Sequence, residues 1–336
     1  YNLGTALAAL NRHEESVASF DRALAIDPAY PDAAWNRSLG LLALGRLREG
    51  LPGYESRWSR AAALTLPNDH LPIFTGREDL AGRTVLIQHE QGYGDAIQML
   101  RLVTNLERAG ARCAIQAPPA LSALLARSFP NAQVVPLGHC PSNAELRVPV
   151  MSLPLAVQLY AESAIPAAVP YLVVDQAKAA HWAVRLDVQA AQRRSRRVGL
   201  VWRGLGTHAN DHNRSLALDA LSPLLRGTGI QFVTLQKGLT PFESRYLAGH
   251  RNVLVADEAL ESFDDTAAVM AALDLVISVD SAPAHLAGAL GKPTWMLLPF
   301  SPDWRWMLAR DDTPWYSTMR LFRQQSIGDW STVIAQ

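Results

Sequence analysis

The sequence has little cysteine, no net charge and no long apolar run, and each shortage excludes a class of protein. Its two cysteines, Cys113 and Cys140, stand in unrelated contexts, which argues against a disulfide framework and a zinc site. The 31 basic and 31 acidic side chains cancel, so no overall charge attracts nucleic acid or an anionic membrane. No stretch approaches the roughly 18 apolar residues of a membrane span. We therefore expect a cytoplasmic protein with no nucleic-acid partner, in which a local site holds any phosphate.

The chain is long enough for two or three globular domains, with 336 residues of which 49% are hydrophobic and 18% charged. It begins with Tyr1 instead of Met and shows no signal peptide. Near the other end, Asp329 and Trp330 have the pattern of a helix start, only a few residues before the sequence stops. We expect a fragment of a longer protein, truncated at both ends.

Residues 1–61 contain a repeat with an offset of 34 positions. The offset aligns aromatic residues with each other, Tyr1 with Trp35 and Phe20 with Tyr54. With Pro28 after the second helix, the pattern resembles the tetratricopeptide family, whose helix pairs bury their apolar faces against neighbouring units. We expect about two units here, the first incomplete, with more units upstream in the natural protein. They serve either as a cap on the next domain or as a groove for an acceptor or a protein partner.

An α/β region follows residues 62–81, which we interpret as a linker because they contain prolines and lack periodicity. Short apolar runs rich in β-branched residues are typical of buried parallel strands, and helical spacing separates them. Such runs lie at 84–88, 113–116, 132–135, 198–202, 231–235, 275–279 and 294–298. The fold class is therefore α/β, with one Rossmann-like domain over 82–190 and a second over 191–336.

A basic cluster, Arg193-Arg194-Ser195-Arg196-Arg197, stands at the border between the two α/β halves. Such a cluster is a candidate for nucleic-acid binding. In a chain without net charge, a solvated linker between domains is the better interpretation.

The segment 280–291 has the signals of a helix that begins directly after a strand. Ser281 suits the N-cap, Pro283 suits the first turn, and Gly291 suits the end. Because the helix starts at the carboxyl end of a strand, we expect its N-terminus to point into a cleft between the domains.

That helix N-terminus is a candidate site for a diphosphate, since free N–H groups and the helix dipole attract anions. The small side chains of Ala282 and Ala284 permit a close approach. The alternative is an ordinary strand–helix unit that binds nothing. His285, inside the helix, is either a packed side chain or a contact to the sugar donor.

Two cations follow other strands of the same predicted sheet. Arg214 ends the loop 203–214, and Lys237 follows the strand 231–235. Because the carboxyl ends of parallel strands share one edge, both are expected to converge on the cleft and neutralise a leaving diphosphate.

The loop also holds His208 and His212, whose i, i+4 spacing is compatible with a metal ion on a helix. They lie in a Gly/Asn/Asp-rich loop without a third ligand nearby. We therefore expect no metal site.

The loop after the first strand is unusually polar. Gly92 and Gly94 match part of a dinucleotide-binding fingerprint, but Ile97 occupies the third glycine position and no acidic residue ends a second strand, which excludes NAD. Asp95 is either a general base for an acceptor hydroxyl or an ordinary helix cap. With Gly92 and Gly94, Tyr93 is expected to face the acceptor.

Six of the nine tryptophans lie from Trp202 onward, and several fall in the stretch 303–316. This stretch either walls the cleft and stacks a base or sugar, or packs as an irregular C-terminal cap.

Two of these motifs together resemble glycosyltransferase family 9, the heptosyltransferase-like group, fused to tetratricopeptide repeats. Val85-Leu86-Ile87 with Gly92-Tyr93-Gly94-Asp95 is similar to the family's opening strand and Gly-Asp loop. The segment 279–286 is similar to its Asp-[Ser/Thr]-x-x-x-His-Leu donor motif. Over residues 80–325, the resemblance implies a GT-B fold, inversion at the anomeric carbon and chemistry without a metal or cofactor, with a nucleotide diphosphate sugar as substrate.

Position by position, the resemblance implies that Asp95 is the catalytic base, that Asp280 lies near the donor sugar, and that the helix start at 281–284 binds the diphosphate. Arg214 stands roughly where heptosyltransferases have a lysine, and that departure leaves its role open. The layout is also similar to protein O-linked N-acetylglucosamine transferases, in which a lysine and a histidine serve the donor; only Lys237 maps onto one of them here.

The sequence therefore predicts an inverting, metal-independent glycosyltransferase that moves a hexose or heptose to a hydroxyl of a glycan or protein. One alternative is a repeat scaffold whose transferase half is degenerate and binds only a partner or nucleotide. Another is a sugar epimerase with the same fold, which leaves the repeats unexplained.

Overall fold

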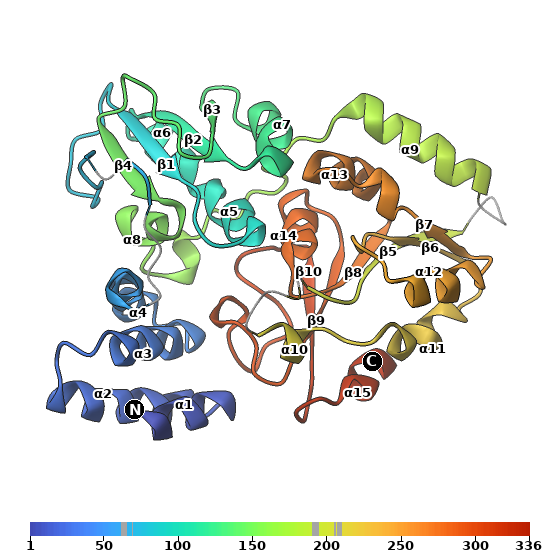
Figure 1. Cartoon of the computed structure of the whole chain (residues 1–336), viewed down its shortest axis with the longest axis horizontal. Helices are drawn as coiled ribbons and strands as arrows, with labels where there is room; N and C mark the ends of the chain where they lie inside the picture. The colour runs from blue at the N-terminus through green and yellow to red at the C-terminus, as the bar shows by residue number, and fades with distance from the viewer. Residues whose placement is uncertain (62–65, 69, 190–194, 205, 207–209) are drawn as a thin grey trace.

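The computed structural model describes residues 1–61, 66–68, 70–189, 195–204, 206 and 210–336. N-terminal helices, a first α/β domain and a second α/β domain follow one another along the chain and pack side by side (Figure 1). Arg193 and Arg194 of the basic cluster, His208 of the histidine pair and part of the predicted linker lie outside the described residues.

The N-terminal region is a run of helices in which each packs against the next. They are α1 (Asn2–Ala9), α2 (His13–Ile26), α3 (Pro31–Ala43), α4 (Leu47–Tyr54) and the 3₁₀ helix η1 (Glu55–Ser59). Gly4 lets α1 and α2 approach closely, because a Cβ there would lie 2.7 Å from the Phe20 ring. The helical region is as expected, and its assignment to the tetratricopeptide family stays a prediction.

The first α/β domain has a parallel four-stranded sheet in the order β3-β2-β1-β4. Its strands are β1 (Thr84–Gln88), β2 (Arg112–Ala117), β3 (Gln133–Pro136) and β4 (Leu146–Pro149). Its helices are α5 (Tyr93–Met99), η2 (Leu100–Leu102), α6 (Val103–Arg108), α7 (Pro119–Ser128), η3 (Val150–Ser152), α8 (Leu153–Ala156) and η4 (Glu162–Ala164). The next helix, α9 (Gln176–Gln189), packs against the second domain. The segment before β1 runs beside the sheet edge, where Ile73 bridges to Arg147 of β4.

The second α/β domain has a parallel six-stranded sheet in the order β10-β9-β8-β5-β6-β7. Its strands are β5 (Arg196–Val201), β6 (Ile230–Thr234), β7 (Val253–Val255), β8 (Leu275–Val279), β9 (Thr294–Leu298) and β10 (Met319–Arg323). Its helices are α10 (Asp211–Arg214), η5 (Leu218–Leu221), α11 (Ser222–Leu225), α12 (Pro241–Ala248), η6 (Asp257–Ala259), α13 (Phe263–Ala271), α14 (Ala282–Ala289), η7 (Trp304–Trp306) and α15 (Trp330–Ala335).

Both sheets are wound outward from a central pair of strands, which confirms the doubly wound parallel prediction. The winding reverses between β1 and β4 in the first sheet and between β5 and β8 in the second. Ligands of such sheets bind beyond the carboxyl ends of the strands at this switch point. The helices that follow β1 and β8 are α5 and α14, so these two helix starts are where a site is expected.

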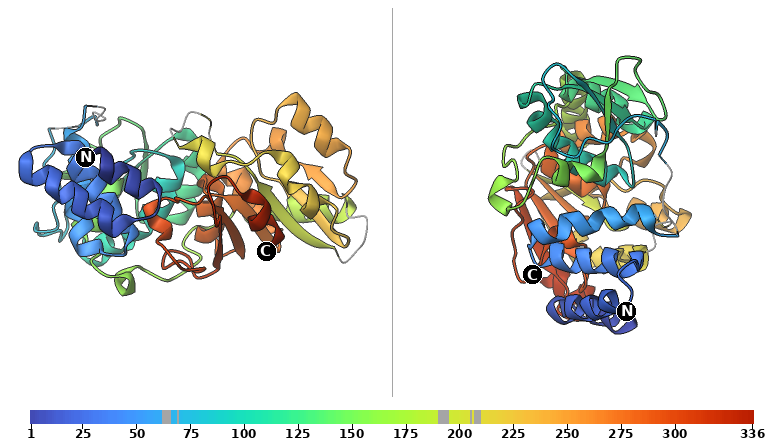
Figure 2. Two further views of the ribbon diagram at one scale, coloured as in Figure 1. Left: turned by 90° about the horizontal axis from the view of Figure 1, so that it is seen from below. Right: turned by 90° about the vertical axis from the view of Figure 1, so that its left-hand side faces the viewer.

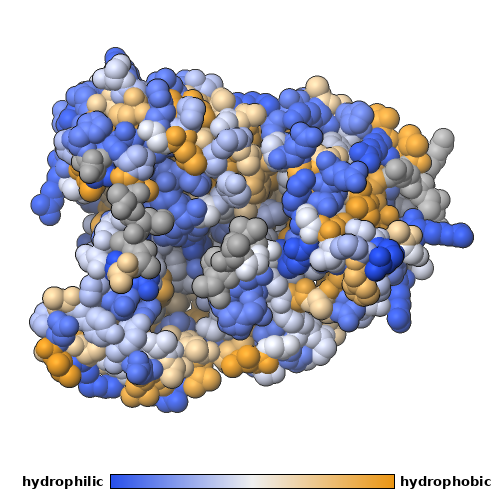
Figure 3. Space-filling view, viewed as in Figure 1, coloured by the Kyte–Doolittle hydropathy of each residue, from blue (hydrophilic) through white to orange (hydrophobic). Residues whose placement is uncertain are grey.

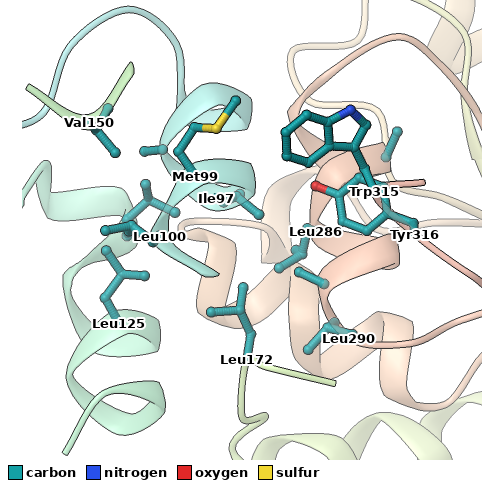
Figure 4. Packing of buried hydrophobic residues seen from close by; sticks show 14 of the residues in the cluster. Ile97, Met99, Leu100, Leu125, Val150, Leu172, Leu286, Leu290, Trp315 and Tyr316 are labelled. Atoms are coloured by element: carbon teal, nitrogen blue, oxygen red, sulfur yellow. The ribbon is translucent and has the colours of Figure 1, made fainter. Parts of the chain in front are cut away.

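One apolar cluster joins all three regions. It runs from Leu42 and Tyr54 of the N-terminal helices through Ile97 of α5 to Leu286 of α14. Figure 4 shows Ile97 and Leu286 on opposite sides of the seam between the two α/β domains, with Leu172 beside them. In Figure 2 the N-terminal helices lie against both the first domain and loops of the second. This packing fixes the three regions around a common centre.

Candidate active site

The starts of α5 and α14 touch each other at the seam between the α/β domains. A Cβ on Gly94 would lie 2.7 Å from His285 Cδ2 and 3.3 Å from the Cα of Ala282. Only glycine therefore permits this approach. The structure thus brings together the two motifs that the sequence analysis singled out, one from each domain. Figure 3 shows a hollow with mostly hydrophilic walls between these domains and the N-terminal helices.

Asp95 has both carboxylate oxygens engaged. Oδ2 accepts the backbone N–H of Gly92 at 2.8 Å, which makes Asp95 a cap for its own helix. Oδ1 accepts a hydrogen bond from Arg305 of the second domain. The side chain is 20% exposed, so one side of the carboxylate faces solvent. The capping role is therefore present, and the carboxylate keeps limited access to solvent.

Arg305 is the centre of the cluster, and the sequence analysis missed it. Its buried guanidinium also donates to Gln98 at 2.6 Å and to Asp303 at 2.7 Å. Burial alone lowers the pKa of Arg305, but the charges of Asp303 and Asp95 outweigh burial and raise it well above its usual range. Arg305 therefore remains a cation that ties the first domain to the second. The only feature of the local sequence that could have indicated Arg305 is its position between two tryptophans, Trp304 and Trp306.

Asp280 follows β8 and is buried beside the same cation. Burial and then the negative charge of Asp303 raise the pKa of Asp280 to about 6. The Trp306 indole, Arg214 and Arg305 oppose this shift. Asp280 is thus close to its titration point near neutral pH.

His285 is held as a neutral ring. Its Nδ1 lies 3.0 Å from the Tyr316 hydroxyl, and the ring stacks on Trp306 with centroids 5.3 Å apart. Burial lowers the pKa of His285 well below its usual value, and the charges of Arg305, Arg101 and Arg214 act in the same direction. At 3.9 Å from Asp280, Nε2 therefore offers a dipole and makes no ion pair.

The start of α14, the predicted anion site, is partly exposed at Ala282 and Pro283, and it has fewer free donors than expected. Ser281 is the N-cap residue, yet its hydroxyl donates to the carbonyl of Val279 at 3.2 Å and makes no cap. Pro283 has no N–H, and Ala284 donates to the Ser281 carbonyl at 3.0 Å.

The two cations that were expected to converge, Arg214 and Lys237, have different surroundings in the structure. The charge of Arg214 acts on both Asp280 and His285, so Arg214 belongs to the cluster, where its Nε also lies 3.3 Å from Asp211. Lys237 is exposed and donates to the carbonyl of Asp257 at 3.0 Å. It fastens its own loop to η6.

The N-terminal helices contribute to the same site. The Tyr54 ring contacts the edge of Trp304, with centroids 6.2 Å apart, and its hydroxyl bonds Gln91. Burial raises the pKa of Tyr54 well above its usual value. The charge of Arg305 lowers this pKa, and the charge of Asp95 raises it. No local pattern in the sequence connects α4 with a loop 250 residues away, so Tyr54 was not predicted.

A buried ion pair anchors these helices to the first domain. Arg57 donates to both oxygens of Glu90, at 3.1 and 2.9 Å, and to the hydroxyl of Ser152 at 2.7 Å. Glu90 also accepts the Met151 N–H at 2.9 Å. Glu90 lies two residues after the end of β1, so the helices are fixed to the strand that leads to Asp95.

Tyr93 of the predicted acceptor loop is exposed and lies against Phe263, with ring centroids 5.1 Å apart.

Within the described residues, no group of three or more histidine, cysteine or acidic side chains is placed to hold a metal ion. None of the helices in the described part of the chain has the length and apolar character that a membrane span requires.

The family model for glycosyltransferase family 9 (heptosyltransferase) matches residues 251–303, which include β8 and the start of α14. Protein FlbA of Caulobacter vibrioides is 30% identical over 326 residues. That match covers 89% of this chain and 53% of FlbA, so the chain spans about half the length of this relative.

Solved structures share the architecture of the two α/β domains at low identity. A family 9 glycosyltransferase from Veillonella parvula is 11% identical with a TM-score of 0.53, over 74% of this chain and 87% of that one. The E. coli ADP-heptose lps heptosyltransferase II is 16% identical with a TM-score of 0.50, over 75% and 96%. The iron-containing dodecameric glycosyltransferase TibC of enterotoxigenic E. coli is 12% identical with a TM-score of 0.51, over 76% and 67%.

These likenesses confirm an α/β GT-B-like fold with parallel sheets. The family match adds a likeness to glycosyltransferase family 9 over residues 251–303.

Proposed function

We propose that the chain is an inverting glycosyltransferase that moves a sugar from a nucleotide diphosphate sugar to an acceptor hydroxyl. One observation carries the proposal: the helix starts of two facing domains meet, and around them stand a solvent-reachable carboxylate, Asp95, and the buried pair Asp280 and His285. The E. coli neighbour is described as an ADP-heptose enzyme, so ADP-linked sugars are the first donors to test.

Each group has a task in this reaction. The start of α14 and Arg214 bind the diphosphate, and neutral His285 points its dipole at the donor. The acceptor oxygen attacks the anomeric carbon as its proton passes to Asp95. The bond from carbon to the diphosphate oxygen breaks, and the diphosphate leaves with the electron pair. Attack from the face opposite the leaving group inverts the anomeric centre.

Metal independence is part of the proposal, because the cations of the cluster supply the charge that a metal would otherwise bring. We further propose that α1 to α4 are tetratricopeptide units that present an acceptor or a protein partner, and that the enzyme acts in the cytoplasm.

Asp95→Asn tests the proposed base. The amide oxygen keeps the cap on Gly92 but cannot take a proton, so kcat should fall about 10²- to 10⁴-fold while nucleotide affinity is unchanged. Transfer from a panel of ADP, UDP and GDP sugars is measured with EDTA present.

Asp303→Asn is the matched control, since it also removes a carboxylate from Arg305 but leaves Asp95 in place. Equal losses in both variants would remove Asp95 from the mechanism. Nucleotide binding without transfer by the native chain would favour a degenerate scaffold.

A further inference from the structure

A pocket of about 350 Å³ lies in the second α/β domain between α9, the amino end of β6, and β7. Arg185 of α9 forms part of its wall, and the rest comes from the segments 230–231 and 251–255 and from Ser195, just before β5. Figure 1 shows α9, β6 and β7 at the end of this domain that is far from α5 and α14. The candidate active site lies at the carboxyl ends of the strands, roughly 15 Å away along a strand of the length of β6. The pocket is therefore a separate site.

The pocket is lined by two arginines and by no acid. Arg185 and Arg251 come from different elements, and within the described part of the chain neither guanidinium forms an ion pair. Two acids at this end of the sheet are already engaged, since Asp187 pairs with Arg197 and Asp274 accepts the Arg197 N–H at 2.8 Å. Two cations without acidic partners give the pocket a local excess of positive charge, which favours an anion.

The Arg185 guanidinium is held in place by its surroundings. Its Cζ lies 4.6 Å from the centroid of the Trp182 ring, and Trp182 is itself buried in the core. Gln231 ties β6 to α9, because its side-chain amide donates to the Leu186 carbonyl at 3.4 Å. An arginine that stacks on a fixed ring loses little freedom on binding, and its planar fork matches two oxygens of a phosphate.

The rest of the wall suits a body that carries hydroxyls. The side-chain N–H of Asn252 donates to the Leu225 carbonyl at 3.0 Å, which leaves its side-chain oxygen able to accept from a hydroxyl. Ile230 and Val253 offer apolar surface beside it. The volume is at the lower end of the range of small-molecule pockets and exceeds what a phosphate group alone requires. A phosphate joined to one sugar ring fits the charge, the acceptor and the size.

We propose that this pocket binds a sugar monophosphate, as a ligand site separate from the start of α14. Arg185 and Arg251 bind the phosphate, and the side-chain oxygen of Asn252 accepts a hydroxyl of the sugar. A phosphate monoester carries nearly two negative charges at neutral pH, which matches two arginines. The site is independent of the proposed transfer reaction.

The test is isothermal titration calorimetry on the whole chain, native and with Ser281→Asp, a change that puts a carboxylate where an anion would bind α14. The probes are glucose 1-phosphate, methyl β-glucopyranoside and succinate. We expect one glucose 1-phosphate to bind both proteins, about tenfold tighter than succinate, because the phosphate offers more charge and more oxygens to the two guanidinium groups. The glucoside has no charge and should not bind measurably.

Three substitutions identify the pocket. Arg185→Gln and Arg251→Gln should each weaken the binding of glucose 1-phosphate about tenfold, the loss of one charge-assisted contact. Arg185→Lys keeps the charge but not the planar fork, so its loss should be smaller. Arg226→Gln is the matched control, since Arg226 is an exposed arginine shortly before β6 and outside the pocket, and it should leave binding unchanged.

The absence of glucose 1-phosphate binding, equal affinity for succinate, or an equal loss in Arg226→Gln would overturn the proposal. So would binding that Ser281→Asp abolishes and both pocket variants retain, because the phosphate would then lie at α14. A failure of nucleotide binding or transfer at α14 leaves the result for the pocket unchanged, so the two sites are tested separately.

Discussion

The two strand–turn–helix units that meet at the candidate site begin their helices in opposite ways. In the first domain, α5 is capped by its own Asp95, which accepts the Gly92 N–H. In the second domain, the Ser281 hydroxyl turns back to Val279 and leaves α14 without a side-chain cap. A helix start with its own carboxylate is already matched to negative charge, whereas an uncapped start is suited to an anion. The difference supports our proposal that the diphosphate binds to the second domain.

The carboxylates of the two units also differ in their surroundings. The Asp95 side chain is 20% exposed and pairs with Arg305, while the Asp280 side chain is 12% exposed and makes no ion pair with a described arginine or lysine. The better exposed carboxylate of the first unit fits the proposed proton transfer, and the more buried one of the second fits the proposed recognition of the donor.

Removing Arg305 should have the largest effect on stability, because both Asp95 and Asp303 lose their shared cation. Loss of one partner from a largely buried ion pair costs about 3 kcal/mol, and we expect Arg305→Met to destabilise the fold by that amount. Urea unfolding measures it. Arg310→Met is the control, since Arg310 forms exposed pairs with Glu162 and Asp312 and should cost less than about 1 kcal/mol. Similar costs for both variants would contradict the central place of Arg305.

Asp280→Asn should change how stability depends on pH. The pKa of Asp280 is raised from 3.8 to about 6, chiefly by burial, so the folded protein keeps a proton that the unfolded chain releases. Ionised Asp280 therefore costs stability as pH rises through this window. We expect the variant's advantage in the free energy of unfolding to grow from well under 1 kcal/mol at about pH 4 to about 3 kcal/mol above about pH 6.5.

The lowered pKa of His285 acts in the opposite direction, with stability lost as pH falls below its usual value. Because His285 is present in both proteins, most of its effect cancels in the difference between them. An advantage of Asp280→Asn that is constant across pH would show that the carboxyl is not perturbed by burial.

Substitutions of Arg214 and Lys237 should have the smallest effects, and they test which cation contacts the diphosphate. Arg214 acts on the cluster, whereas Lys237 binds Asp257 at the surface. Arg214→Met should weaken binding of nucleoside diphosphates about tenfold, the loss of one charge-assisted contact, and Lys237→Met should leave it unchanged. Isothermal titration calorimetry distinguishes them. The reverse order would place the diphosphate farther out, at the end of β6.

The central strands were predictable from sequence, and most strands at the sheet edges were not. The strands at Thr84–Gln88, Leu275–Val279 and Thr294–Leu298 match the predicted runs to the residue, since buried parallel strands are continuous apolar segments. The missed strands are β4, β7 and β10, and all three are sheet edges. Edge strands are short or carry charge, as with the arginines in β10, so their apolar signal is weak.

The residues of the candidate site also fall into a group that the sequence predicts and a group that it does not. Asp95 and the α14 start were predictable because helix caps and strand ends leave local signals. Arg305 meets Asp95 across 210 residues of sequence, and Tyr54 reaches Trp304 from the N-terminal helices. Such contacts depend on how the three regions pack, which no local pattern specifies.

The most direct test of the account gives α14 the kind of cap that α5 has. Ser281→Asp places a carboxylate at the start of α14, where it fills the anion position. Thermal unfolding is followed with ADP, UDP and GDP, with no metal added. We predict that one nucleotide raises the melting temperature of the native chain, as mass action requires, and has no effect on Ser281→Asp. Equal stabilisation of both proteins, or of neither, would contradict the assignment of the diphosphate to α14.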